Sequence, residues 1–427
     1  MQKSSLGWLR QLGPGLLFAG MAIGTSHLVQ STRAGAVFGL GLAGVILLAN
    51  IAKYPAYRFG AAYAAATGET LIAGYRRIGL LPLLFLMAVF VFAHGFAVAA
   101  IGVVTAGMFK AVLGVNLPLL GTIAIVLGAC ALFLALGRYK LLESVNRFFM
   151  AVLTLSTLVA TVLVLPNVDW SLYPDSAPPF DLTAFLFVVA LAGWMPTPIE
   201  ASVFSSLWTL ARKQAGGDAV PATDAARDAA VGEAVTDFNV GYVWTTLLAL
   251  CFMLLGAGVM HASGVVPEDS APGFAAQLVA LYSHTLGPWS APVVGVAAFT
   301  VMFTTAITVL DGLTRALVVS FATLRGEREE DVKAGSGRGY IFVLAGLCVA
   351  ALLLVAFFMQ GFRAFIDLVT SIAFLTAPVF AWLNHRTMMQ PHVPEAHRPR
   401  GGILVWSYLS ITVLGAFAFV YLWLLVS

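Results

Sequence analysis

The chain has 427 residues, of which 60% are hydrophobic and only 10% are charged, and its mean hydropathy is +0.92. Soluble domains carry about 25% charged residues, so this composition excludes an ordinary soluble protein and predicts an all-α polytopic membrane protein. The net charge of +3 is too small to predict a nucleic-acid partner, and three cysteines without CxxC spacing predict neither a disulfide framework nor a zinc site.

Eleven apolar stretches are long enough, at about 20 residues, to be predicted membrane spans. They cover residues 12–32, 36–57, 81–109, 117–136, 148–167, 182–207, 238–261, 287–324, 340–359, 362–384 and 402–426. No hydrophilic block between them is long enough for a second folded domain. The sequence therefore predicts a single transmembrane domain over residues 1–427.

Lysine and arginine are concentrated in alternate connections between the predicted spans. The basic connections contain Lys3, Arg10, Arg58, Arg76, Arg77, Arg138, Lys140, Arg147, Arg212, Lys213, Arg325, Arg328, Lys333, Arg338, Arg386, Arg398 and Arg400. The connections 167–181 and 262–285 contain acidic residues and no Lys or Arg. By the positive-inside rule, the N-terminus is expected in the cytoplasm and the C-terminus outside, with the protein in the cytoplasmic (inner) membrane. Arg33 and Lys53 lie near span ends and are expected to reach towards the lipid headgroups.

A polar interruption lies within the first predicted span, 12–32. Gly24, Thr25, Ser26 and His27 stand in a row there and lower the local hydrophobicity. Glycine also weakens a helix by about 1 kcal/mol relative to alanine. The sequence therefore predicts an unwound segment at about residues 24–27.

A second interruption lies within the sixth predicted span, 182–207. Pro196 and Pro198 each remove a backbone donor and clash with the preceding turn, and Glu200 follows them. Two interrupted spans, five spans apart and crossing in opposite directions, indicate two five-span halves in inverted topology, with a solute site between the interruptions. The halves are expected at about 12–167 and 182–384, followed by an extra helix at 402–426.

A pair of interrupted spans is also compatible with simple kinks in two helices. A channel or a sensor with the same fold is a further alternative to a transporter.

The sequence contains no GxSxG, HExxH or Walker A string, so it predicts no enzyme, no catalytic residue and no cofactor. The expected partners are a small solute, a coupling H⁺ or Na⁺ and the lipid bilayer.

Four short segments stand out beside the interruptions: Gly13-Pro14-Gly15 and Ala34-Gly35-Ala36 around the first span, "GRYKLLE" at 137–143 and "TTAIT" at 304–308. These segments resemble the Nramp family of proton-coupled divalent metal transporters. The resemblance implies a LeuT-like fold of 5+5 transmembrane helices plus one, with unwound helices 1 and 6, and a role in metal transport by alternating access.

The same resemblance breaks down at the site itself. Gly24 stands where the DPGN motif of the family has its metal-binding aspartate, and His27 stands where it has the asparagine. In the MPH motif Met195 is retained, but Thr197 replaces the histidine. The third span contains His94 in a region where the family has carboxylates. We therefore expect a metal selectivity that differs from that of the family.

Two interpretations of the solute follow from these residues. As metal ligands, His27, Met195 and Glu200 could together hold Mn²⁺, Fe²⁺ or a softer ion, with Glu200 supplying the charge that Gly24 removes. Metal transport by a divergent Nramp-like protein is therefore the leading prediction.

The alternative is an ion-coupled transporter of a small organic solute such as an amino acid. The small side chains of Gly24, Thr25 and Ser26 would let a carboxylate approach the backbone of a half-helix, and Thr197 adds a hydroxyl. Glu200 would then bind an amino group or the coupling ion.

Three further intramembrane groups are candidates for coupling. Asp311 and Arg315 are four residues apart, hence on one helix face, and are expected to form a structural ion pair or to take part in coupling. His94 is expected to be either a satisfied interior histidine or a proton relay.

Overall fold

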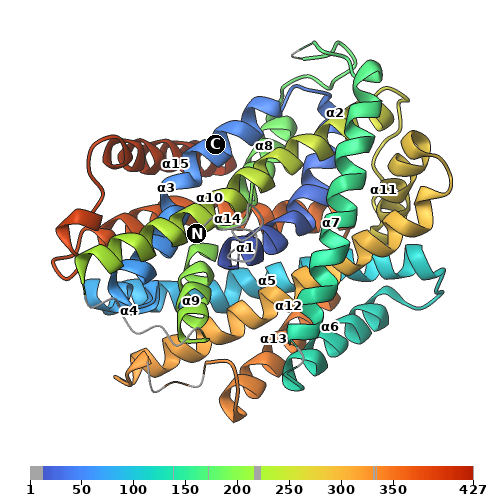
Figure 1. Ribbon diagram of the computed structural model, residues 1–427. Coiled ribbons are helices and arrows are strands. Elements are labelled where there is room, and N and C mark those ends of the chain that lie inside the picture. Colours follow the sequence, from blue (N-terminus) through green and yellow to red (C-terminus); the bar gives the residue numbers. More distant parts are fainter. Residues whose placement is uncertain are drawn as a thin grey trace, which may run out of the picture.

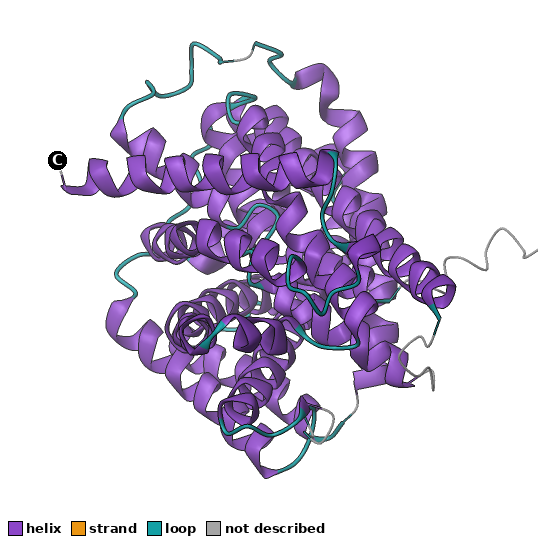
Figure 2. Ribbon diagram, turned by 90° about the vertical axis from the view of Figure 1, so that its left-hand side faces the viewer, coloured by secondary structure: helices purple, strands orange, loops and turns teal. Residues whose placement is uncertain are grey.

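The computed structural model describes residues 13–137, 139–171, 173–215, 223–329, 332 and 334–426. Within these ranges the chain forms helices joined by loops and no strand (Figure 2). The predicted all-α class is therefore confirmed. Lys3, Arg10, Arg138 and Lys333, which contributed to the prediction of sidedness, lie outside the described residues, and the sidedness stays a prediction.

The helices follow the predicted spans in order. They are α1 (Pro14–Ala22), η1 (Ile23–Ser31), α2 (Thr32–Phe38), α3 (Ala43–Thr67), α4 (Leu71–Ile78), α5 (Leu80–Leu113), α6 (Leu119–Ala135), α7 (Tyr139–Val164), η2 (Leu165–Asn167), α8 (Leu182–Gly193), α9 (Ala201–Ala215), α10 (Asp224–Leu255), η3 (Gly256–His261), α11 (Ala271–Leu286), α12 (Ser290–Leu324), α13 (Arg338–Phe358), α14 (Phe362–Met388), η5 (Glu395–His397) and α15 (Gly402–Val426).

In the described part of the chain, seven helical stretches are long and apolar enough to cross a membrane. They are Leu80–Leu113, Phe148–Asn167, Asp224–His261, Ser290–Leu324, Arg338–Phe358, Phe362–Met388 and Gly402–Val426. The other four predicted spans fall short for physical reasons. The first and sixth are interrupted, α6 has only 17 residues, and α3 contains the polar residues Asn50, Lys53 and Arg58.

Both predicted interruptions are present, and this confirms unwound helices 1 and 6. In the first predicted span, the backbone of Gly24 is not helical, with φ −69° and ψ −128°. The turns after it are wider than those of an α-helix. In the sixth, α8 ends at Gly193 and α9 begins at Ala201, so the segment 194–200 between them is not helical. The division into repeats at about 12–167 and 182–384 stays a prediction.

The first half-helix, α1, lies in the middle of the bundle, where it contacts α10, α12 and α9 (Figure 1). Gly15 and Gly241 face each other where α1 crosses α10, and a side chain on either would run into the backbone of the other helix. The Asp237 carboxylate of α10 accepts hydrogen bonds from the backbone N–H groups of Gly13, at 3.1 Å, and Gly15, at 2.9 Å. Asp237 thereby satisfies donors that the start of a helix leaves without an intrahelical partner.

The Arg33 side chain does not reach towards the lipid headgroups, so the expectation from the sequence is wrong. Its side chain is buried and forms a two-pronged ion pair with Asp367 of α14, with N–O distances of 2.8 and 3.0 Å. Arg33 also donates to Gln30, and its guanidinium lies 5.0 Å from the ring centre of Phe187 in α8. The Asp367 carboxylate therefore pairs with the Arg33 charge inside the protein. The contacts of Arg33 connect α2, α8 and α14.

Candidate functional site

A small cavity of about 30 Å³ lies between the two interruptions. Its walls come from the interrupted first and sixth spans, from α5 and from α12. The polar residues that line it are Thr25, Ser26, His94, Trp194, Thr197 and Thr305. Both interruptions therefore face one shared cavity, which has room for one or two water molecules.

Thr25, Ser26 and Thr197 line the cavity as the sequence predicts. The Thr25 hydroxyl is buried and has no hydrogen-bond partner. The Ser26 hydroxyl lies 2.5 Å from the Ala22 carbonyl oxygen and 3.0 Å from the Pro196 carbonyl oxygen, and it therefore bridges the two interruptions. Thr25 therefore offers a hydroxyl that is open to a ligand.

His27 does not line this cavity. Its side chain is fully buried, and its Nε2 lies 2.8 Å from the carbonyl oxygen of Thr245 in α10. Its Nδ1 lies 2.7 Å from the Ser26 hydroxyl oxygen. Both ring nitrogens therefore have partners, and a metal ion would have to displace one of them.

Met195 also lies away from the cavity. It is fully buried and belongs to an apolar cluster that includes Ala34, Phe38, Leu191 and Met253. Across the described ranges, no group of three or more His, Cys, Asp or Glu side chains is arranged to hold a metal ion. His27 and Met195 therefore already have partners within the protein, and their role as metal ligands together with Glu200 stays a prediction.

Glu200 does not line the cavity, but it contacts His94, which does. Both are buried, and His94 Nδ1 lies 3.8 Å from Glu200 Oε1. His94 Nδ1 and both oxygens of Glu200 have no hydrogen-bond partner. Thr376 lies near the carboxylate, but its hydroxyl donates to the Ala373 carbonyl oxygen at 3.1 Å. Buried polar groups without partners are rare in proteins, so this pair is suited to binding a ligand or a proton.

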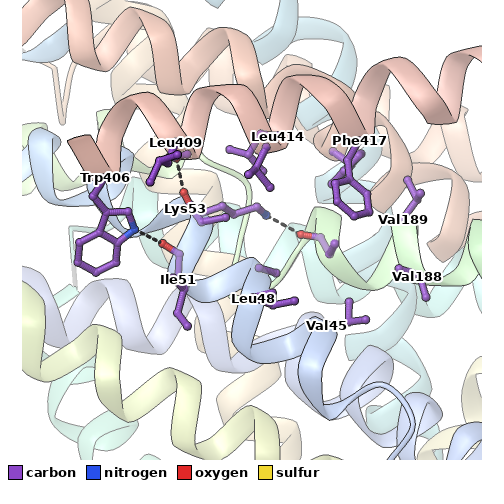
Figure 3. A pocket seen from close by; sticks show the side chains of 16 residues that line it. Val45, Leu48, Ile51, Lys53, Val188, Val189, Trp406, Leu409, Leu414 and Phe417 are labelled. Atoms are coloured by element: carbon purple, nitrogen blue, oxygen red, sulfur yellow. Dashed lines mark hydrogen bonds between the residues drawn. The ribbon is translucent and has the colours of Figure 1, made fainter. Parts of the chain in front are cut away.

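The Lys53 side chain does not reach towards the lipid headgroups either, so this expectation from the sequence is also wrong. Its side chain is fully buried, and Figure 3 shows it at the inner end of an apolar pocket of about 290 Å³ between α3, α8, α14 and α15. Nζ lies 2.7 Å from the carbonyl oxygens of Ala192 and Gly193 and 3.3 Å from that of Thr197. The Lys53 ammonium and the Glu200 carboxylate also attract each other electrostatically.

Asp311 and Arg315 form an ion pair outside the cavity lining. Arg315 Nε lies 2.7 Å from Asp311 Oδ2, and the Tyr340 hydroxyl donates to Asp311 Oδ1 at 2.7 Å. Asp311 therefore joins α12 to α13. This geometry fits the structural alternative for the pair, and its role in coupling stays untested.

Gly24 is in tight contact with α12. A Cβ atom at this position would lie 2.6 Å from Thr305 Cγ2, closer than carbon atoms approach. The Thr305 hydroxyl is itself fixed, because it donates to the Gly20 carbonyl oxygen at 2.9 Å. A side chain at position 24, including the aspartate of the Nramp pattern, has no room in this arrangement.

We expect Gly24→Ala to lower the stability of the protein by about 1–3 kcal/mol, the usual cost of overpacking. Gly44→Ala is the matched control, because a Cβ there meets nothing within 4 Å. Thermal unfolding of the purified variants measures the difference. Thr305→Ser removes the clashing methyl group and should restore most of the loss in Gly24→Ala. Equal shifts for Gly24→Ala and Gly44→Ala would show that the contact is not tight.

Two features of the site are not predicted by the sequence. Trp194 lines the cavity with an indole Nε1 that has no hydrogen-bond partner. Its position just before Met195 and Pro196 is the only signal of this role. Lys53 lies near the end of a predicted span, but α3 continues to Thr67, which places Lys53 inside the helix.

Comparisons with known proteins give one relative and a set of solved structures. The uncharacterized protein PM0681 of Pasteurella multocida is 35% identical over 416 residues, which cover 96% of this chain and 91% of that protein. No family model matches the chain.

The solved structures that the chain resembles include two transporters. A crystal structure of a mutant of the Eremococcus coleocola manganese transporter has a TM-score of 0.72 at 13% identity, covering 99% of this chain and 88% of that one. Mhp1, a nucleobase-cation-symport-1 family transporter in a closed conformation, has a TM-score of 0.56 at 15% identity, covering 96% and 92%. Such low identities show the fold alone, and they confirm the LeuT-like fold.

Proposed function

Because the chain belongs to the same family as the uncharacterized protein PM0681 and has a LeuT-like fold, we propose that it is a secondary active transporter of a small polar organic solute. In this proposal the solute site is the cavity between the interruptions, and the protein works by alternating access. Membership of the Nramp family stays a prediction.

The unpartnered polar groups beside the cavity are the observation that carries this proposal. Thr25 and Trp194 offer hydrogen-bond donors, Glu200 offers acceptors, and His94 Nδ1 offers either, depending on its protonation. An indole N–H can only donate, so Trp194 suits an oxygen or nitrogen acceptor on an organic molecule and cannot ligate a metal. A solute with both kinds of group would satisfy the whole set.

Charge balance supports the same solute class. Glu200 does not line the cavity, but its carboxylate contacts His94, which does, and the Lys53 ammonium attracts it. A divalent cation that loses its water needs uncompensated negative charge nearby. A site whose own charges balance is better suited to a neutral or zwitterionic solute.

The cavity volume sets a condition on this proposal. About 30 Å³ is too small for an amino acid, so a solute of that size enters only after the half-helices move apart. Alternating access requires such movement in any case. In the proposed cycle the Glu200–His94 pair holds the coupling proton, since both groups are buried, unpartnered and able to exchange one.

A divalent transition metal is the second candidate solute. The 3.8 Å between His94 Nδ1 and Glu200 Oε1 lets both atoms ligate one ion at roughly 2.1 Å each. The ion would need further ligands, and the unpartnered Thr25 hydroxyl on the cavity wall is one candidate.

Binding measurements on purified protein test the two candidates. We expect calorimetry to give heat with one or more zwitterionic or carboxylic solutes and none with Mn²⁺, Fe²⁺ or Mg²⁺. Thr25→Val, which removes a hydroxyl and keeps the shape, should weaken solute binding by about tenfold, equivalent to about 1.4 kcal/mol.

Thr300→Val is the control for that variant. The Thr300 hydroxyl donates to the Val296 carbonyl oxygen on the outer side of α12, so its loss should leave binding unchanged. Heat with a metal alone would favour the metal candidate. Equal binding by wild type and Thr25→Val would mean that the solute binds elsewhere.

A further inference from the structure

Lys53 occupies a place in the fold that suits a free cation. The three carbonyl oxygens around Nζ belong to the end of α8 and to the segment that follows it. The last carbonyl groups of a helix have no intrahelical donor, and the helix dipole makes this end negative. In a membrane these oxygens must be satisfied by the protein or by a ligand.

We propose that Lys53 is an internal cation that fills this carbonyl cluster in place of a free monovalent cation such as Na⁺. An ammonium group has three donors and no acceptor, which matches the three carbonyl oxygens at 2.7, 2.7 and 3.3 Å. The protein accordingly needs no Na⁺ at its sixth-span interruption, and its coupling to solute movement does not use one there.

The surroundings of Nζ explain why a cation belongs at this position. Figure 3 shows the Lys53 side chain among apolar side chains, including Leu48, Leu409 and Leu414. Its Nζ donates to the carbonyl oxygen of Ala192. The Glu200 carboxylate is the nearby opposite charge. The carbonyl oxygens of Thr197 and Ala192 have other donors as well, among them the Tyr57 hydroxyl and the Met195 N–H, but these donors are neutral. Lys53 therefore supplies the positive charge that balances the end of α8 and the Glu200 carboxylate.

Removal of the lysine should therefore create a cation site. Carbonyl and carboxylate oxygens are the ligands that hard cations prefer. Lys53→Ala removes the ammonium and leaves room for an ion, whereas Lys53→Met removes the charge but fills much of the same volume. A site for Na⁺ is expected in Lys53→Ala and a weaker one in Lys53→Met.

Thermal unfolding without added solute tests this inference independently of the proposed solute. Each protein is heated in equal concentrations of sodium chloride or choline chloride, so that ionic strength is matched. The melting temperature of Lys53→Ala should be at least about 2 °C higher in sodium than in choline, because an ion that binds only the folded state stabilises it. Wild type should melt at the same temperature in both salts.

Lys110→Ala is the matched control, because Lys110 also donates to a backbone carbonyl oxygen, that of Leu117, but at the exposed end of α5. It should behave as wild type does. If neither Lys53 variant folds in choline, recovery of folded Lys53→Ala only from sodium-containing buffers supports the inference. Specific stabilisation of wild type by Na⁺, no sodium effect on a folded Lys53→Ala, or loss of both variants in both salts overturns it.

Discussion

Glu200→Gln is expected to abolish solute transport and to destabilise the protein by about 1–3 kcal/mol, because it removes the charge that compensates a buried cation. The carboxylate is fully buried beside His94 and is attracted by Lys53. Glutamine keeps the shape but leaves the Lys53 ammonium without its opposite charge. Uptake into proteoliposomes and chemical unfolding of the purified variant measure the two effects.

The double variant Lys53→Met/Glu200→Gln separates stability from transport. It removes both charges at once, so most of the lost stability should return, whereas transport should stay absent because the proton-binding carboxylate is gone. Glu327→Gln, on an exposed loop position, is the control and should change neither quantity. Normal transport by Glu200→Gln would exclude Glu200 from the coupling mechanism.

Loss of either partner in the Arg33–Asp367 pair is expected to lower stability by about 2 kcal/mol and to slow transport. The pair is partly exposed on the Asp367 side, at 31%, so we expect less than the full cost of a buried ion pair. Because it connects α2 with α14 beside Phe187 of α8, its loss should also let the cavity open more readily on that side.

A double-mutant cycle with Arg33→Gln, Asp367→Asn and the combined variant isolates this contact. A coupling energy of about 1–3 kcal/mol is expected from two hydrogen bonds between charged groups. The rate at which a thiol reagent labels Thr25→Cys reports how often the cavity opens. Additive effects and unchanged labelling would show that the ion pair does not restrain the helices.

Much of the fold is predictable from the sequence because it rests on long, simple patterns. Apolar runs of span length can be satisfied in a bilayer only by helices, and the long helices α5, α12, α14 and α15 follow them closely. The break in the sixth span is predictable for a different reason. Pro196 and Pro198 cannot both belong to a continuous helix, and α8 accordingly ends before them.

The side-chain geometry of the site is not predictable in the same way. After an irregular turn such as the one at Gly24, the direction of each following side chain depends on local backbone angles that residue spacing does not reveal. His27 therefore points towards Thr245 rather than into the cavity, although Thr25 and Ser26 line it. Met195 likewise packs into an apolar cluster.

The burial of a charge is hard to predict where a helix continues beyond its most apolar part. The predicted span 36–57 places Lys53 near its end, but small residues such as Ala61, Ala62 and Ala64 continue α3 to Thr67. An alanine-rich turn is only mildly hydrophobic and yet strongly helical. The length of the helix, rather than the hydropathy of its first half, determines how deep the lysine lies.

The glycine contact between α1 and α10 restricts how α1 can move. No side chain separates the backbones at Gly15 and Gly241, and the Asp237 carboxylate accepts hydrogen bonds from the first turn of α1. A movement of α1 alone would therefore break these contacts with α10. If the protein works by the alternating access proposed above, we expect α1 and α10 to move as one unit, with the irregular backbone at Gly24 as the pivot. Loosening that pivot alone would then leave the contacts between this unit and its neighbours unchanged.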